Sequence, residues 1–495
     1  MRPKDGRHSI FMRMGQGILN AILFLWRRPS PPQQITLRSI IPKKLDQPAP
    51  IVGDPYLTYD IFVYLMFFLD KAELLSVMQT CRGLQTGGVS CLLQRAPILT
   101  SDKHMRSFFS FMLVDRPYRF PMLQTCNLGL RCTLSDSAFS LMIQTLARCN
   151  NITTLHLTIF DEVLEENPNV AMAIASLPCV KCCWIHAHAR VYTVAEFIGW
   201  MPSPIESLAF ESHQGLAYPD MLLQNFKMTL ESLIVSFADF TELKAEYPHL
   251  QHLEFIDEAA VKLDTATLAR TFPALSTWEF PFHPPKHDGF PEYTRWLNQA
   301  GFKKDGCWDH LDNISGHIRH IYRTGVTCRV DQLICHMDVS DANELQVILH
   351  DLRPRRLQLR IELEVFPLDL PRNLLAEASN MTDLRLTIVF DSFQDVPQAE
   401  IIEDLYDILA TLRLTYLSVM LKWQDIEMHL HSSHPTLLAL KKLGDLDFVA
   451  RASSAIPTLR SIAFSVSGIS VSEWSIQKSP HGNRIPRLDR MQWLS

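Results

Sequence analysis

Residues 152–157 read ITTLHL, with apolar side chains at the first, fourth and sixth positions, namely Ile152, Leu155 and Leu157. The last two are separated by one residue, as on one face of a β-strand. The same motif occurs seven times between residues 123 and 280, and successive motifs begin 20 to 29 residues apart. The regular recurrence predicts an array of similar units. The other six motifs are Leu123-Cys126-Leu128, Val180-Cys183-Ile185, Ile205-Leu208-Phe210, Leu230-Leu233-Val235, Leu250-Leu253-Phe255 and Leu275-Trp278-Phe280.

Helical patterns lie between the motifs. Ala138, Leu141, Met142 and Thr145 have the spacing of one helix face, and Val194, Phe197, Ile198 and Met201 repeat it. No strand–turn–helix unit buries its apolar face alone, so neighbouring units must stack. The period is that of leucine-rich repeats, which predicts an α/β solenoid (horseshoe) with parallel strands on the concave face and helices on the convex face. The alternative is an ordinary α/β domain with parallel strands.

The motif becomes less regular after residue 280. The Pro-rich stretch PFHPPKHDGF, residues 281–290, breaks the register, so we expect a first solenoid part at 98–280, an irregular interruption at 281–329 and a second part at 330–495. The stretch IIEDLYDILATLR predicts an amphipathic helix in the second part. The weaker motifs are Val330-Leu333-Cys335, Leu357-Leu359, Met381-Leu384-Leu386, Leu414-Leu417-Val419 and Leu459-Ile462-Phe464.

Residues 1–54 are expected to be an N-terminal extension and a Pro-rich linker. The apolar run GILNAILFLW, residues 17–26, is shorter than the roughly 17–25 apolar residues that cross a bilayer. Arg27-Arg28-Pro29 follows where a signal peptide has its cleavage site. We predict no membrane span; a membrane-surface helix, a weak targeting segment and an uninformative extension all stay open.

The charge and the cysteines narrow the class of protein. A net charge of −6 argues against nucleic-acid binding. The 11 cysteines are odd in number and follow no disulfide framework, which favours a reducing compartment, so we expect a cytoplasmic or nuclear protein.

One cluster has zinc-ligand chemistry: CVKCCWIHAH, residues 179–188, with Cys179, Cys182, Cys183, His186 and His188. The stretch is also the third repeat strand, on which Cys182 and Cys183 point to opposite faces. We therefore expect small buried thiols and no metal. The sequence contains no phosphate-binding glycine loop, GxSxG or HExxH motif, so we predict no enzyme activity and no cofactor.

Residues 57–84, LTYDIFVYLMFFLDKAELLSVMQTCRGL, form a short helical segment with more apolar side chains than it can bury. An exposed stripe of them would dock a partner helix-in-groove. The segment resembles an F-box, and we expect a three-helix F-box at 55–97. Thr58 and Tyr64 stand where the family usually has proline and an acidic residue. The matching residues are Leu57, Asp60, Ile61, Leu65, Phe68, Leu69, Leu74, Leu75, Thr80, Cys81, Arg82 and Leu84.

An F-box followed by irregular leucine-rich repeats resembles fungal, basidiomycete-type F-box proteins. The segment from Cys307, CWDHLDNISGHIRHIYRTGVTCRVDQLIC, is similar to one in their middle. The resemblance implies the substrate-recognition subunit of an SCF-type (cullin-RING) E3 ubiquitin ligase, bound to an adaptor protein and through it to a cullin. The alternatives are a cap on the solenoid end and a repeat scaffold without a ubiquitin-ligase role. The expected adaptor-binding residues are Leu57, Ile61, Leu65, Leu69, Leu74 and Leu75.

The third, fifth and seventh motif positions should face the concave side, because strand side chains alternate. An exposed tryptophan beside histidines, and arginines, are typical of protein-binding surfaces, so we expect an unknown protein target there. The alternative is that Trp184 packs beneath a neighbouring repeat. The candidate target-binding residues are His156, Trp184, His186, His252, Glu254, Arg356, Arg360 and Arg385.

Overall fold

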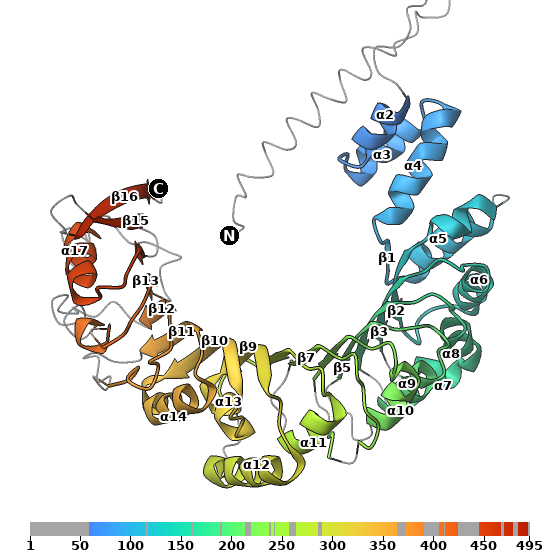
Figure 1. Cartoon of the computed structure of the whole chain (residues 1–495). Helices are drawn as coiled ribbons and strands as arrows, with labels where there is room; N and C mark the ends of the chain where they lie inside the picture. The colour runs from blue at the N-terminus through green and yellow to red at the C-terminus, as the bar shows by residue number, and fades with distance from the viewer. Residues whose placement is uncertain are drawn as a thin grey trace, which may run out of the picture.

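The structure is a computed structural model. The described part of the chain forms one open 16-stranded sheet in which the strands follow one another in sequence order. The sheet curves into an arc, with the strands along the inner, concave side and the helices along the outer side (Figure 1). The predicted α/β class is confirmed, and the arrangement is solenoid-like. The described residues are 59–114, 117–160, 162–188, 191–212, 219–236, 239–241, 243–256, 264–285, 290–363, 373–390, 405–409, 411–423, 445–466, 470–478 and 484–493.

The strands are β1 (Ile98–Leu99), β2 (Thr125–Leu130), β3 (Thr154–Ile159), β4 (Cys182–Ala187), β5 (Ser207–Ser212), β6 (Ser232–Val235), β7 (His252–Phe255), β8 (Thr277–Glu279), β9 (His310–His317), β10 (Arg329–Asp338), β11 (Arg356–Leu363), β12 (Asp383–Phe390), β13 (Tyr416–Trp423), β14 (Ser461–Val466), β15 (Ser470–Lys478) and β16 (Arg484–Trp493). The α-helices are α2 (Tyr59–Met66), α3 (Lys71–Met78), α4 (Arg82–Gln94), α5 (Asp102–Leu113), α6 (Asp136–Leu146), α7 (Val163–Glu166), α8 (Pro168–Ala175), α9 (Val191–Gly199), α10 (Pro219–Leu223), α11 (Thr265–Thr271), α12 (Pro291–Asp305), α13 (Ile318–Thr324), α14 (Ala342–Leu352) and α17 (Asp445–Ala455). Short 3₁₀ turns are η1 (Pro117–Met122), η2 (Gln224–Phe226) and η3 (Val339–Asp341).

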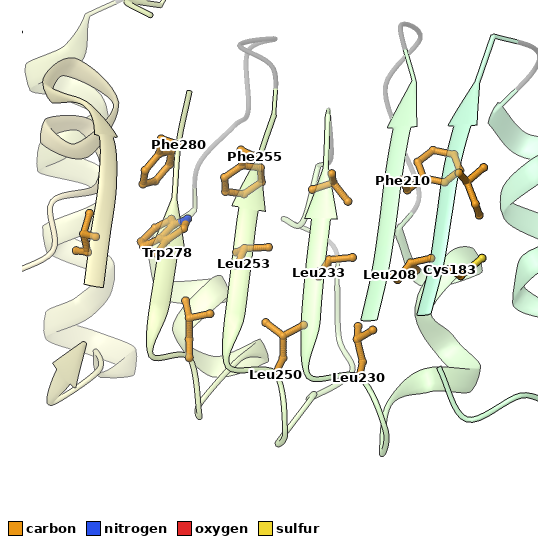
Figure 2. Close-up of a cluster of buried hydrophobic side chains, with 14 of the residues drawn as sticks. Cys183, Leu208, Phe210, Leu230, Leu233, Leu250, Leu253, Phe255, Trp278 and Phe280 are labelled. Atoms are coloured by element: carbon orange, nitrogen blue, oxygen red, sulfur yellow. The ribbon is translucent and has the colours of Figure 1, made fainter. Parts of the chain in front are cut away.

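The seven regular motifs supply the core of the first part of the arc. Each of their 21 apolar side chains is at most 4% exposed. The side chains at the fourth position form a continuous row, because parallel pairing places each one opposite the next strand's equivalent (Figure 2). Neighbouring units thus cover one another's apolar faces, which is why the fold requires stacking. The row runs through Cys183, Leu208, Leu233, Leu253 and Trp278.

The helices bury the faces that their spacing predicts. In α6, Ala138, Met142 and Thr145 are buried. The Ser135 hydroxyl caps this helix by accepting a hydrogen bond from the Ala138 N–H, which satisfies one of the free donors in the first turn. In α9, Phe197 and its neighbour Ile198 are buried too. The amphipathic pattern therefore identified both the helices and their core-facing sides.

Helices α2, α3 and α4 form a small unit at the N-terminal end of the arc (Figure 1). Its interior contains Phe62 and Met66 of α2, with exposures of 6% and 1%. Asp70 and Glu73 form a capping box at the start of α3, in which each carboxylate accepts a hydrogen bond from the other residue's N–H, at 2.8 and 2.9 Å. The three expected helices are present in this segment.

We expected residues 281–329 to interrupt the array, but the sheet continues through this segment. The segment contains β9, which pairs in parallel with β8 and β10. Leu311 and Ile314 of β9 are fully buried at the first and fourth motif positions, whereas the sixth position is Gly316. Because this position lacks an apolar side chain, the repeat motif does not predict the strand.

The C-terminal end also differs from the expected array of parallel strands. Strand β15 pairs antiparallel with β14, and β16 pairs antiparallel with β15. Trp474 of β15 lies opposite Ile462 and is 9% exposed. The hairpin therefore covers β14, the last strand that carries the motif, and caps the core.

Residues 1–58 lie outside the described residues, and with them the apolar run 17–26, Leu57 and Thr58. Within the described ranges, no helix is both long enough and apolar enough to cross a membrane.

Candidate functional site

The helical unit carries several large exposed apolar side chains, and we call the pair of exposed rings among them that are in contact, Tyr64 and Phe68, the aromatic face. Tyr64 and Leu65 follow Ile61 by three and four residues, so each lies near Ile61 on the surface of α2. The Tyr64 and Phe68 rings meet edge-on with centroids 5.2 Å apart, yet these two side chains are 63% and 69% exposed. Both rings are therefore accessible on the surface of the unit. The other large exposed apolar side chains of the unit are those of Tyr59, Ile61, Phe67 and Leu75.

The structure corrects two of the expected adaptor-binding residues. Leu69 is 4% exposed and Leu74 is fully buried, so neither is available to a partner. Leu74 lies on the buried side of α3, together with Val77 and Met78. Of the two adjacent leucines, Leu75 is the one that points outward. Ile61 and Leu75 are exposed as expected, and Leu65 is half-buried. The exposed rings of Tyr64 and Phe68 were not among the expected adaptor-binding residues.

The strands place the candidate target-binding side chains on the concave face. Trp184 of β4 lies opposite His156 of β3 and Ala209 of β5. Its indole is 46% exposed and lies 5.7 Å from the His156 ring, so it does not pack beneath a neighbouring repeat. Ala209 is small, and a hollow of about 240 Å³ opens beside the indole, with Ile234 among its walls. This concave hollow can receive an apolar side chain.

Charged groups border the concave hollow. His186 Nδ1 lies 2.7 Å from the Glu211 carboxylate. Further along, the Glu254 carboxylate lies 3.7 Å from His252 Nε2 and is the largest influence on this imidazole; it raises the pKa of His252, which burial opposes and Glu279 reinforces. The concave face between β5 and β8 therefore carries three carboxylates, from Glu211, Glu254 and Glu279.

The candidate arginines lie on a different part of the concave face. Arg356 and Arg360 belong to β11, and Arg385 belongs to β12. Arg360 is paired with Glu362 at 2.9 Å, and Arg385 lies over the Tyr416 ring at 5.8 Å. Seven strand spacings separate β4 from β11, which is roughly 34 Å at about 4.8 Å each. The structure therefore does not bring these arginines together with Trp184, and one compact ligand cannot contact both groups.

The cysteines and histidines of residues 179–188 do not converge on one point. Cys183 is fully buried, and burial raises its pKa to about 12, whereas Cys182 lies on the opposite, concave face of β4. His188 stacks on Phe160 with ring centroids 4.6 Å apart. These side chains do not form a metal site of the kind that their spacing suggested.

Two other groups in the described part of the chain have metal-ligand chemistry: His310 with Asp312 and Asp331, and His317 with Asp338 and Asp341. In the second group, Arg319 Nε lies 2.7 Å from Asp341 and already balances its buried charge. The first group lies on the surface, where clusters of acidic side chains are common. We assign no function to either group. No protein-family model matches the chain, and the search of curated proteins finds no match.

Proposed function

We propose that the chain is the substrate-recognition subunit of an SCF-type ubiquitin ligase. The single observation that supports this best is the aromatic face, which exposes the Tyr64 and Phe68 rings on a three-helix unit that resembles an F-box. In F-box proteins this unit docks the adaptor. The chain itself would supply no chemistry; its contribution would be a high local concentration of target near the ubiquitin-transferring subunits.

The concave face would hold the target. The hollow beside Trp184 fits an apolar side chain, and the indole supplies the large rigid contact area on which binding energy concentrates. The charges suggest complementary partners: basic groups opposite Glu211, Glu254 and Glu279, and acidic groups opposite the arginines of β11 and β12. A target segment that follows the arc would meet both regions in turn.

A second function is a repeat scaffold that binds partners without ubiquitin transfer. The observation in its favour is Tyr64, an exposed tyrosine where F-boxes usually have an acidic residue. The two functions differ in one respect: only the first requires adaptor and cullin binding.

The experiment compares two variants in capture of purified adaptor. Phe68→Asp places a charge on the aromatic face at a side chain that is 69% exposed, so the unit should still fold. The matched control is Trp296→Asp, which makes the same type of change at a 60% exposed ring on α12. We expect loss of about 2 kcal/mol or more of adaptor affinity for Phe68→Asp alone. Adaptor capture by both variants at wild-type strength contradicts the F-box proposal and leaves the scaffold.

A further inference from the structure

A polar pocket of about 610 Å³ lies at the amino-terminal ends of β10, β11 and β12. Its lining residues belong to the segments that lead into these parallel strands, or to the first residue of a strand. Three arginines line it: Arg329 begins β10, Arg353 follows α14, and Arg355 precedes β11. We call it the arginine pocket. Its volume lies within the usual range for small-ligand sites, about 300–1,000 Å³.

The charge balance of the arginine pocket is strongly positive. Its single acidic residue, Asp351, is bound by Arg295, whose side chain is only 9% exposed and also donates to the Tyr322 carbonyl at 3.0 Å. Arg295 is therefore a buried counter-ion for Asp351. The positive charges of Arg329, Arg353 and Arg355 are left for a ligand, in a protein whose net charge is −6.

Arg353 is held in place by the backbone. It ends α14 in a left-handed conformation, with φ 45° and ψ 54°, and its N–H donates to the Leu349 carbonyl, as is common at the C-terminal end of a helix. Its Nε donates to the His350 carbonyl at 3.3 Å, which caps the end of α14 and leaves its terminal nitrogens for other acceptors. Helix capping explains the presence of Arg353 in the pocket. It does not explain Arg329 and Arg355, which lie at the starts of strands.

Neutral hydrogen-bond donors complete the lining. Thr327 and Asn380 offer a hydroxyl and an amide to the pocket, whereas the Thr382 hydroxyl, which also lines it, already donates to the Asp383 carboxylate. Guanidinium groups surrounded by hydroxyl and amide donors match the oxygens of phosphate, which arginine binds through paired N–H groups. We propose that the arginine pocket binds a phosphate-bearing ligand. Its source is either a phosphorylated side chain of a bound protein or a free phosphorylated small molecule.

Isothermal titration calorimetry of the full chain tests this with two probes: inorganic tripolyphosphate, and a short Ala/Gly peptide with two phosphoserines. Arg329→Gln with Arg355→Gln should lower the affinity for the bound probe about tenfold or more. The matched control is Arg148→Gln with Arg270→Gln, which removes the same charge from exposed arginines just after α6 and in α11, outside the pocket, and should change affinity less than twofold. Asn380→Asp, a single change at an exposed residue, should also weaken binding by repelling the anion.

The probes distinguish the two sources. Tighter binding of the phosphopeptide than of tripolyphosphate, with no binding of the unphosphorylated peptide, indicates a phosphorylated protein segment. Tighter binding of tripolyphosphate indicates a free phosphorylated small molecule. Two results overturn the proposal: saturable binding of neither probe, or equal loss in the pocket variant and its control. Adaptor capture is measured separately at the helical unit, so this outcome does not depend on the proposed ligase function.

Discussion

At the scale of single residues, strand alternation was a reliable guide. His156, Trp184 and His252 all lie on the concave face, because a period of two leaves no other orientation once the motif leucines are buried. Alternation could not show which of these residues lie near one another. The separation between Trp184 and Arg356 depends on the number of intervening strands, and β9 had been missed.

Trp184→Ala should weaken target capture by about 2 kcal/mol or more, because the indole forms the edge of the concave hollow. The stability of the protein should change little, since the side chain is 46% exposed. Trp200→Ala is the control, because Trp200 is 53% exposed and follows α9. Target capture from cell extract and thermal unfolding are measured for both; an equal effect of the two substitutions on capture would move the site away from the hollow.

His336 should make the folded protein sensitive to acid. Burial, helped by the charge of Arg360, lowers the pKa of His336 from 6.5 to about 4. The unfolded chain therefore binds this proton more readily, and folding stability is lost as pH falls from about 6.5 towards 4. Urea unfolding at pH 7 and pH 5 should show a smaller loss for His336→Gln than for wild type. His104→Gln, at an exposed position on α5, should retain the full loss; a wild-type pH dependence in His336→Gln would refute the assignment.

At the scale of elements, the sequence predicted those whose apolar residues follow a period and missed those that depart from it. Gly316 removed the sixth-position side chain from β9. In α3, the leucines Leu74 and Leu75 are adjacent and therefore point to different sides of the helix. The sequence alone does not show which side faces the core. Packing in the structure turns Leu74 inward and Leu75 outward. The hairpin of β15 and β16 was missed because its alternation does not repeat the motif.

Gly316 is required for close packing of β8 and β9. Its φ is +137°, and an added Cβ would lie 2.5 Å from Phe280 Cβ and 2.8 Å from the Phe280 carbonyl oxygen. Gly316→Ala should therefore destabilise the protein by about 2 kcal/mol or more. Gly306→Ala separates the two causes, since Gly306 also has positive φ, +89°, but faces open space; it should cost about 1 kcal/mol. Equal shifts in denaturant midpoint would show that Phe280 does not constrain the glycine.

At the scale of the whole molecule, an open arc of stacked units needs protection at both ends. The C-terminal hairpin covers one end, and the helical unit stands at the other (Figure 1). Capping of the core is sufficient to explain why Trp474 of the hairpin is buried. The helical unit exposes large apolar side chains, whereas a unit that only caps the solenoid would have a polar outer face. That excess of exposed rings is the basis of the account in which the chain joins two partners.

The most direct test of that account is quantitative affinity purification of wild type, Phe68→Asp and Trp184→Ala from the cells that make the protein, with adaptor, cullin and all other captured proteins measured by mass spectrometry. The account predicts reciprocal losses. Phe68→Asp loses adaptor and cullin together and retains the other partners, whereas Trp184→Ala retains adaptor and cullin and loses one or more of the others. Absence of adaptor and cullin from the wild-type sample, or the same set of losses in both variants, would contradict it.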